Sequence, residues 1–357
     1  MNKNSGFRIS DSLISWYSVN KRDLPWRETG DPYCIWISEI ILQQTRVNQG
    51  YDYYLRFIQR FPSVKVLAGA SEDEVLKYWQ GLGYYSRARN LHKAAKRIAS
   101  SFNGVFPREY HDVIALSGVG DYTAAAICSL AYNQPYAVVD GNVYRVLSRL
   151  FGIATPINST KGKKEFAGLA QELIDKKHPA LYNQAIMDFG ALMCTPASPK
   201  CGDCPLQAAC KAYELKRQEY FPVKENKSNV TNRYFNYLFV NHASDTYLKK
   251  RGEKDIWAGL YEFPLIEAGK LLSGEELLQD GNFQRLFGGV DVELHRFSTP
   301  VKHKLSHRLI EAQFILLRID NETPLLKEYL RVPLSRLQDY PVSRLISLFL
   351  ENGGVSF

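Results

Sequence analysis

Four cysteines near the middle of the chain constrain its fold more than any other feature. They follow the spacing C-x6-C-x2-C-x5-C and are Cys194, Cys201, Cys204 and Cys210. Thiolates packed into so short a stretch bind Zn²⁺ or an iron–sulfur cluster, because sulfur ligands suit both. Zinc motifs usually join two C-x2-C pairs across a longer gap, and only one such pair occurs here. The spacing therefore favours a [4Fe–4S] cluster held by one loop, although it matches neither common ferredoxin pattern. Buried thiols or disulfides are the plainer alternative.

The bulk properties are those of an ordinary globular protein with a basic surface. A chain of 357 residues predicts two or three hydrophobic cores. The formal net charge of +8 favours a polyanionic partner. Cys34 and Cys128 lie among apolar residues, which indicates buried thiols in a reducing compartment. The N-terminal segment has no apolar signal core, and no run reaches the length of a membrane span. We expect a soluble monomer of the bacterial cytoplasm or nucleoid.

The pattern of apolar residues changes from helix-like to strand-like after the first two thirds of the chain. Residues 8–215 show apolar spacing of three and four residues, as in WISEIILQQTRV and GNVYRVLSRLF, which predicts helices. A polar segment follows, and we expect a linker over residues 216–232. Beyond it, YFNYLFVNH, DTYLKKR and LIEAQFILLRID predict strands, and DYPVSRLISLFLEN predicts a closing helix. The fold class is therefore multidomain, an all-α region followed by an α+β domain.

Two segments place backbone amides where they can meet an anion. LSGVGDYTAAAI sets a glycine turn, with Gly118, Val119 and Gly120, directly before a helix of small residues. Both glycines permit positive φ and close backbone approach, and the free amides at the helix start suit a nucleic-acid phosphate. An ordinary connection between helices would explain the turn equally well. Asp140 then precedes another helix, where it suits an N-cap whose amides keep the carboxylate ionised.

Glu39 is a second candidate carboxylate. It lies in WISEIILQQTRV, and it shares a helix face with Gln43. A buried face is expected from Ile37, Ile40, Ile41 and Val47. A solvent-exposed helical glutamate is the default, yet an apolar pocket would raise the pKa of Glu39 toward that of a general acid. Two carboxylates in contrasting settings suit cleavage through an oxocarbenium-like cation.

A basic stretch with aromatic residues at its head occupies residues 81–99. GLGYYSRARNLHKAAKRIA carries five cations and no acid, and Tyr84 and Tyr85 open it. Such a run is usually a solvated helix face. Aromatic side chains beside cations, Arg87 among them, also suit a wedge that enters unstacked bases.

Taken together, the motifs resemble the MutY-type adenine DNA glycosylases of the endonuclease III superfamily. The matching motifs are LPWR, SEIILQQTRV, GLGYYSRARNL, LSGVGDYTAAAI, VVDGNVYRVLSR and the cysteine quartet. The resemblance implies a helix-hairpin-helix catalytic region over 1–215, made of a six-helix domain at about 23–135 and a [4Fe–4S] domain from 1–22 and 136–215. It also implies a Nudix-like domain over 233–357 that recognises 8-oxoguanine, on the evidence of DIWAGLYEFPLIE.

The resemblance assigns roles to single residues. Glu39 would protonate the adenine leaving group, Asp140 would stabilise the sugar cation, Tyr122 would support the site and Asn142 would orient water. Gln44 and Tyr84 would enter double-stranded DNA as adenine is flipped. The adenine pocket would be lined by Trp26, Arg27, Leu42 and Gln184.

Two further positions define the expected reaction. Bifunctional relatives carry a lysine where this chain has Tyr122, and a phenol forms no Schiff base, so we expect a monofunctional hydrolase. In KHKLSHR, Ser306 and His307 resemble the loop that reads 8-oxoguanine, with Leu305 where the family more often has Phe. The expected substrate is adenine opposite 8-oxoguanine or G. The alternatives are a thymine or uracil mismatch glycosylase and a non-catalytic iron–sulfur DNA-binding protein.

Overall fold

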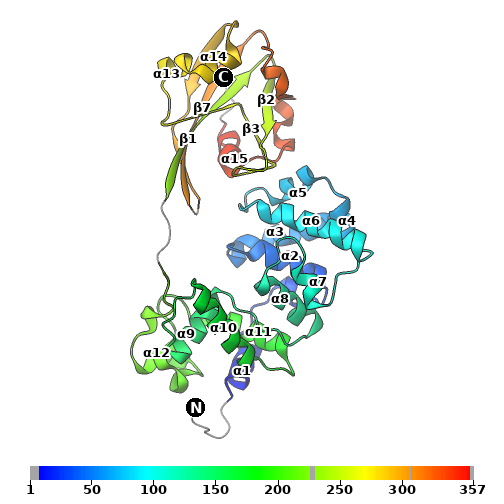
Figure 1. Cartoon of the computed structure of the whole chain (residues 1–357), viewed down its shortest axis with the longest axis vertical. Helices are drawn as coiled ribbons and strands as arrows, with labels where there is room; N and C mark the ends of the chain where they lie inside the picture. The colour runs from blue at the N-terminus through cyan, green and yellow to red at the C-terminus, as the bar shows by residue number, and fades with distance from the viewer. Residues whose placement is uncertain (1–7, 226–229, 306, 354–357) are drawn as a thin grey trace. The chain divides into compact units, whose positions relative to one another are not determined.

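The computed structural model describes residues 8–225, 230–305 and 307–353, which form two compact units (Figure 1). The first comprises Met1–Gly69 with Lys93–Asn226, and the second comprises Ala70–His92 with Lys227–Phe357. This division differs from the boundaries expected from the sequence, because residues 70–92 pack with the C-terminal domain.

The first unit is helical, as the periodicity predicts. Its helices are α1 (Ile9–Asn20), α2 (Pro32–Leu42), α3 (Val47–Arg60), α4 (Val64–Gly69), α7 (Tyr110–Ile114), α8 (Asp121–Tyr132), α9 (Gly141–Phe151), α10 (Thr160–Leu173), α11 (Pro179–Leu192) and α12 (Lys211–Glu214). Helix α6 (Ser86–Ser101) contributes residues to both units. Within the described residues, no helix combines the length and the hydropathy needed to cross a membrane.

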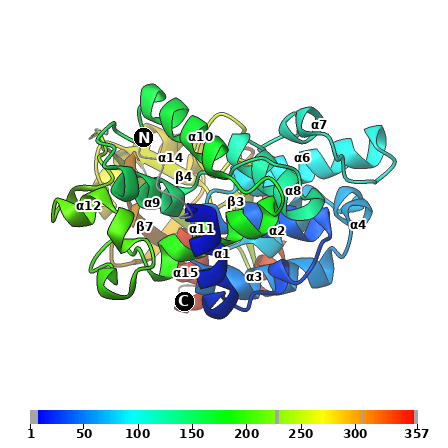
Figure 2. The ribbon, with the colours of Figure 1, turned by 90° about the horizontal axis from the view of Figure 1, so that it is seen from below.

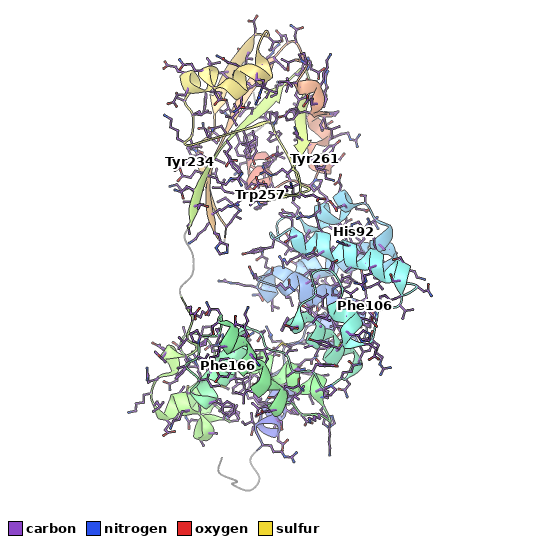
Figure 3. All side chains as sticks on the ribbon, in the orientation of Figure 1. His92, Phe106, Phe166, Tyr234, Trp257 and Tyr261 are labelled. Atoms are coloured by element: carbon purple, nitrogen blue, oxygen red, sulfur yellow. The ribbon has the colours of Figure 1, made fainter. Side chains whose placement is uncertain are left out.

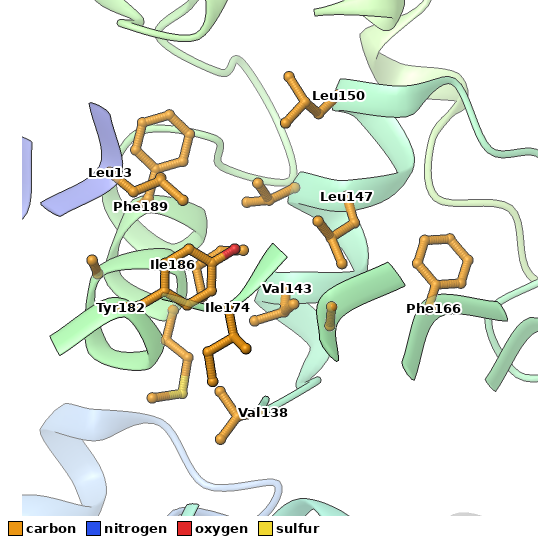
Figure 4. Packing of buried hydrophobic residues seen from close by; sticks show 14 of the residues in the cluster. Leu13, Val138, Val143, Leu147, Leu150, Phe166, Ile174, Tyr182, Ile186 and Phe189 are labelled. Atoms are coloured by element: carbon orange, nitrogen blue, oxygen red, sulfur yellow. The ribbon is translucent and has the colours of Figure 1, made fainter. Parts of the chain in front are cut away.

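One hydrophobic cluster holds the cysteine-containing half of this unit together (Figure 4). Helix α1 lies beside α11 and buries Leu13 completely (Figure 2). Val143 and Leu147 of α9 meet Ile186 of α11 in the same cluster. Each such side chain contributes about 1.5–3 kcal/mol when it is buried. The cluster therefore fixes the start of α9, where Asp140 lies, against α11.

The helix predicted through WISEIILQQTRV is interrupted. Helix α2 ends at Leu42, Gln44 adopts a left-handed backbone with a φ of 55°, and α3 begins at Val47. Val47 is half-buried and belongs to the next helix, so the prediction that it shares the buried face of α2 is wrong. The break turns Gln43 and Gln44 away from the helix path of Glu39.

The second unit contains α5 (Glu72–Trp79) and two sheets. The larger sheet has the order β4-β1-β7-β5, with β6 also paired to β7, and β1 and β7 run parallel. The smaller sheet has the order β3-β2-β8. The remaining elements are β1 (Thr231–Asn241), β2 (Asp245–Lys250), β3 (Tyr261–Glu262), β4 (Leu265–Ala268), β5 (Val292–Phe297), β6 (Val301–Lys304), β7 (Arg308–Ile319), β8 (Leu330–Pro333), α13 (Gly274–Gln279), α14 (Gly281–Phe287) and α15 (Arg344–Glu351).

Alternate residues of β1 and β7 pack on opposite faces of the larger sheet. Phe239 and Phe314 face α15 through Phe349, whereas Leu238 and Leu317 face α13 and α14. Successive strand residues point to opposite faces, so strands covered on both sides read as continuous apolar runs. The strands predicted from YFNYLFVNH, DTYLKKR and LIEAQFILLRID and the closing helix are confirmed as β1, β2, β7 and α15.

The first part of the expected linker packs on the helical unit. Residues Gln218–Tyr220 form a 3-10 turn, and the backbone N–H of Ile157 donates to Val223 O at 3.0 Å. Strand β1 already begins at Thr231. Polar composition hid these contacts, because they are made by backbone groups that every residue carries.

Candidate active site

The two candidate carboxylates line one cavity of the helical unit. Its volume is about 330 Å³, within the range of roughly 300–1,000 Å³ for small-molecule sites. Glu39 comes from α2, Tyr122 from α8 and Asp140 from the start of α9. Residues separated by about a hundred positions are thus brought to one place by the packing of three helices.

Glu39 occupies the drier part of the cavity. Its side chain is 8% exposed, and burial raises the pKa of its carboxyl to about 7. Tyr122 Oη donates to Glu39 Oε2 at 2.7 Å, which opposes the rise, as does the charge of Arg27. The negative charge of Asp140 adds to it. A carboxyl that carries its proton near neutral pH has the property required of a general acid.

Asp140 is the N-cap of α9. Its Oδ1 accepts from Val143 N at 2.7 Å and its Oδ2 accepts from Asn142 Nδ2 at 2.8 Å. Burial raises the pKa of Asp140, while these hydrogen bonds and the charge of Arg145 oppose the rise. Three groups therefore favour the ionised form, yet they do not outweigh burial.

Asn142 is engaged on both sides of its amide. Its Nδ2 donates to Asp140, and its Oδ1 accepts from Arg145 Nη2 at 2.8 Å. Arg145 also donates to Gly190 O at 2.6 Å and to Cys194 O at 2.7 Å. A Cβ on Gly190 would lie 2.7 Å from Asn142 Cβ, so only glycine lets α11 approach this closely.

The four expected pocket residues line the same cavity. Trp26 and Arg27 come from a 3-10 turn, Leu42 from the end of α2 and Gln184 from α11. Gln184 Oε1 accepts from Tyr17 Oη at 2.8 Å, and Arg27 pairs through both nitrogens with the fully buried Asp188. These contacts fix the side chains before any ligand enters.

The two glycines of the turn adopt different backbone conformations. Gly118 has a φ of 77°, in the region that favours glycine. Gly120 is the N-cap of α8 with a φ of −107°, and a Cβ there would meet nothing within 4 Å. Gly118 therefore uses the positive φ that glycine permits, and Gly120 does not. Val119 is buried in the same turn.

The expected DNA-contacting residues fall in both units. Gln44 is exposed and lines the cavity in the first unit. In the second unit, Tyr84 is 49% exposed and has a φ of 48°. Arg87 Nη2 donates to Gly83 O at 3.2 Å, and its guanidinium lies over the rings of Trp79 and Tyr84. Arg87 therefore supports the turn that presents Tyr84.

The cysteine quartet gathers around one small cavity that is also lined by Arg149. The buried Arg149 donates to backbone carbonyls along the loop, among them Thr195 O at 2.7 Å and Pro196 O at 3.0 Å. Its Nη1 lies 3.4 Å from Cys194 Sγ. In the part of the chain that the structure describes, no three His, Cys, Asp or Glu side chains are grouped to hold a single metal ion. Four thiols lining one cavity, with a buried cation beside them, are a donor set that fits an anionic thiolate cluster.

The expected lesion-reading loop lies between β6 and β7. Ser306 lies outside the described residues. His307 is exposed, and its carbonyl accepts from Thr231 N at 3.2 Å. Leu305 packs against the core beneath the sheet. A leucine therefore anchors the loop at the position where the family more often has Phe.

Several residues around the cavity were not found from the sequence. Asp188, Arg22 and Met187 line or support it, and Arg145 and Arg149 connect it to the cysteine loop. The available signals were an aspartate inside the apolar run NQAIMDFGAL and two arginines four apart in YRVLSRLF. Each is a charge in a pattern that predicts burial, where charges need partners.

Comparisons with known proteins agree with this architecture. Residues 37–176 match the family described as HhH-GPD superfamily base excision DNA repair protein, and residues 236–352 match the NUDIX domain. The adenine DNA glycosylase of Buchnera aphidicola subsp. Acyrthosiphon pisum (strain APS) is 34% identical over 90% of this chain and 89% of its own length. The adenine DNA glycosylase of Homo sapiens is 33% identical over 88% of this chain and 67% of its own length.

Solved structures resemble the helical part. A thermostable thymine-DNA glycosylase has a TM-score of 0.54 and 31% identity, covering 58% of this chain and 95% of its own. Endonuclease III in a non-covalent DNA complex has a TM-score of 0.51 and 22% identity, covering 58% and 94%, a likeness of fold alone. With a helix-hairpin-helix core, a Nudix domain and relatives matched along most of its length, this chain belongs to the MutY family of adenine DNA glycosylases.

Proposed function

We propose that the protein hydrolyses the N-glycosidic bond of adenine mispaired with 8-oxoguanine, or with G, in double-stranded DNA. The observation that carries the proposal is the pair of carboxyls in one cavity, Glu39 in a dry setting and Asp140 at a helix start. The matched relatives are named adenine DNA glycosylases, which supports adenine as the base released.

In this mechanism Glu39 gives a proton to a ring nitrogen of adenine. Its pKa of about 7 leaves a large fraction protonated at neutral pH. Tyr122 Oη holds Glu39 Oε2 at 2.7 Å and so orients the carboxyl toward the cavity. Protonation makes adenine a better leaving group as the bond to C1′ breaks.

Asp140 stabilises the oxocarbenium-like sugar cation left behind. The ionised carboxylate does this directly or through a transient bond to C1′, as in glycoside hydrolysis. Asn142 holds Asp140 Oδ2 and keeps one amide hydrogen for the incoming water. Water completes hydrolysis and leaves an abasic site. Tyr122 offers a phenol and not an amine, which supports a monofunctional reaction without a Schiff base.

Access to the bond requires that adenine leaves the base stack. Extrusion costs a few kcal/mol. We propose that Gln44 and Tyr84 enter the double helix as adenine moves into the pocket of Trp26, Arg27, Leu42 and Gln184, while Gly118, Val119 and Gly120 approach the phosphate backbone. Ser306 and His307 would contact 8-oxoguanine on the opposite strand.

The cysteine quartet would hold a [4Fe–4S] cluster. When bound, the cluster would supply a structural crosslink that shapes the loop of residues 194–210. Arg149 contacts the loop carbonyls and Cys194 Sγ, and Arg145 contacts Cys194 O. These residues tie the loop to α9, the helix that begins at Asp140 and Asn142.

A single-turnover assay on duplexes with adenine opposite 8-oxoguanine, G or T tests the proposal. We expect strand cleavage only after alkali treatment, with the fastest release opposite 8-oxoguanine. Release of thymine or uracil with no release of adenine would favour the mismatch glycosylase, which the thymine-DNA glycosylase likeness of the helical part keeps as the second candidate. DNA binding without release of any base would favour the non-catalytic protein.

A further inference from the structure

The turn between α5 and α6 holds an unusual backbone. Within residues 80–85, Gly81 has a φ of 98°, Gly83 a φ of 75° and Tyr84 a φ of 48°. The positive φ of Tyr84 is a backbone conformation that residues other than glycine rarely adopt, and the tyrosine ring is half exposed. Strained positions persist only where their surroundings enforce them, and they gather at functional sites.

Part of that enforcement is local. The Trp79 indole N–H donates to Gly83 O at 3.2 Å, and Arg87 Nη2 donates to Leu82 O and Gly83 O. The Arg87 guanidinium lies between the rings of Trp79 and Tyr84, at 5.2 and 5.7 Å from their centroids. These contacts shape the turn but do not fix its two ends.

Both ends of the turn are held by the C-terminal domain. Gln80 Nε2 donates to Ser347 Oγ at 3.2 Å, and Gln80 Oε1 accepts from Val342 N at 3.4 Å. Tyr85 Oη donates to Val342 O at 3.3 Å, and the same oxygen accepts from Gly81 N. Val342 and Ser347 lie before and within α15, so one short segment contacts both flanks of Tyr84.

The adjoining helices are held by the same domain. Asp73 of α5 accepts from Tyr261 Oη at 2.9 Å and pairs with Lys250, and Tyr261 is labelled in Figure 3. Arg89 of α6 donates to Ala258 O. A Cβ at Gly259 would lie 3.2 Å from a carboxylate oxygen of Glu72. The segment that connects β2 to β3 therefore packs directly on α5.

We infer that Gln80 and Tyr85 are positioning residues through which the C-terminal domain sets the conformation of Tyr84. The inference rests on the proposed role of Tyr84 in base extrusion. The domain proposed to read the lesion then also controls the residue that opens the base stack. Lesion recognition and extrusion are thereby coupled through two side chains and one backbone segment.

The test measures base unstacking and adenine release together. Gln80→Ala and Tyr85→Phe are compared with matched controls, Gln284→Ala and Tyr132→Phe, each of which loses one side-chain hydrogen bond to a backbone carbonyl outside residues 80–85. 2-Aminopurine beside the mispaired adenine reports unstacking by fluorescence, and single-turnover kinetics report release. We expect each test variant to lower both by at least about two- to tenfold, the range for one net hydrogen bond, because each variant loses two. The controls should match the wild-type protein, and thermal melting should show that all variants are folded.

A double-mutant comparison separates positioning from general destabilisation. In a Tyr84→Ala background, Gln80→Ala should cause no further loss, because the residue it positions is gone. Equal losses with and without Tyr84 would overturn the inference. Ser347→Ala, which removes one of the two hydrogen-bond partners of Gln80, should lower unstacking and release as Gln80→Ala does, and a wild-type result would also overturn the inference.

The same data distinguish this inference from the proposed function. If Tyr84→Ala slows release and Gln80→Ala does not, the coupling is wrong and the role of Tyr84 stands. If Tyr84→Ala changes neither unstacking nor release, the coupling and the proposed role of Tyr84 in base extrusion are both overturned, whereas adenine release by the wild-type protein would still support the proposed activity.

Discussion

Two sides of the cavity each carry one carboxyl, and their surroundings differ. We call the side formed by α2, with Glu39, the α2 wall, and the side formed by the start of α9, with Asp140, the α9 wall. On α2, the carboxyl of Glu39 is buried and accepts a hydrogen bond from the hydroxyl of Tyr122, and burial raises its pKa to about 7. On α9, Asp140 receives two hydrogen bonds from the helix start and the charge of Arg145. Glu39 is thus the more buried of the two residues, and fewer groups stabilise its charge. In the proposed mechanism this difference would let Glu39 act as the proton donor and Asp140 as the cation stabiliser, although both carry the same carboxyl group.

The largest expected effect is the loss of either carboxyl. Glu39→Gln and Asp140→Asn should each lower single-turnover adenine release by about 10²–10⁴-fold, the usual contribution of a positioned acid or base. Binding of the mispaired duplex, measured by fluorescence anisotropy, should persist. Retention of near wild-type rates by both variants would break the comparison, because neither carboxyl would then do chemistry.

The second effect concerns stability and has a defined sign. The pKa of Glu39 is raised from 4.5 to about 7 in the folded protein. The stability of the neutral form is fully present below pH 4.5 and is lost as pH rises through about 7. Since one pKa unit corresponds to about 1.4 kcal/mol, this loss amounts to roughly 3 kcal/mol.

Glu39→Gln does not titrate, so its unfolding free energy relative to wild type should increase across that window. Urea unfolding at pH 5 and pH 8 measures the difference, with the exposed Glu165→Gln as control. A difference that is independent of pH would show that Glu39 is not neutralised by burial.

A smaller effect is expected at the α9 wall. Asn142→Ala removes the side-chain donor to Asp140 and leaves Arg145 without one acceptor. Hydrogen bonds to charged groups contribute about 1.5–3 kcal/mol, so release should slow by about 10–150-fold. The pH dependence of the rate should show whether Asp140 then needs a higher pH to ionise. An unchanged rate and profile would remove Asn142 from the positioning of Asp140.

The smallest effect is a shift along the pH axis. The hydrogen bond from Tyr122 lowers the pKa of Glu39, so Tyr122→Phe should raise it. The alkaline limb of the single-turnover profile, expected near pH 7 in the wild type, should move to higher pH. A limb that moves to lower pH would contradict the assignment of Glu39 as the titrating acid.

Periodicity predicted much of the fold, and the misses have physical causes. The runs that became α9, β1 and β7 were readable because burial repeats at the period of each structure. The break after Leu42 could not be predicted in this way, because QQT carries neither glycine nor proline, although Gln44 adopts a left-handed backbone. The membership of residues 70–92 in the second unit depends on contacts made more than 150 positions away.

The site residues, too, fall into those that could be found from the sequence and those that could not. Glu39 and Asp140 were candidates from their sequence surroundings, the family resemblance added Tyr122, and the structure brings all three to one cavity. Arg145, Arg149 and Asp188 were missed because their importance lies in the partners they meet: backbone carbonyls and buried counter-charges. A sequence pattern marks which residues are buried but does not say which carbonyl a buried arginine will find.

The second unit joins two segments that are far apart in the chain, so they are synthesised at different times. Tyr85 leaves the ribosome about 257 residues before Val342, its partner across the unit, and at about 5–20 residues per second this gap lasts roughly 13–50 s. Throughout that interval residues 70–92 have not yet met the C-terminal residues against which they pack in the folded unit. The nascent chain therefore lacks the partners of Gln80 and Tyr85 until residues 342–347 are made, and a protein cut short before Val342 would lack them permanently.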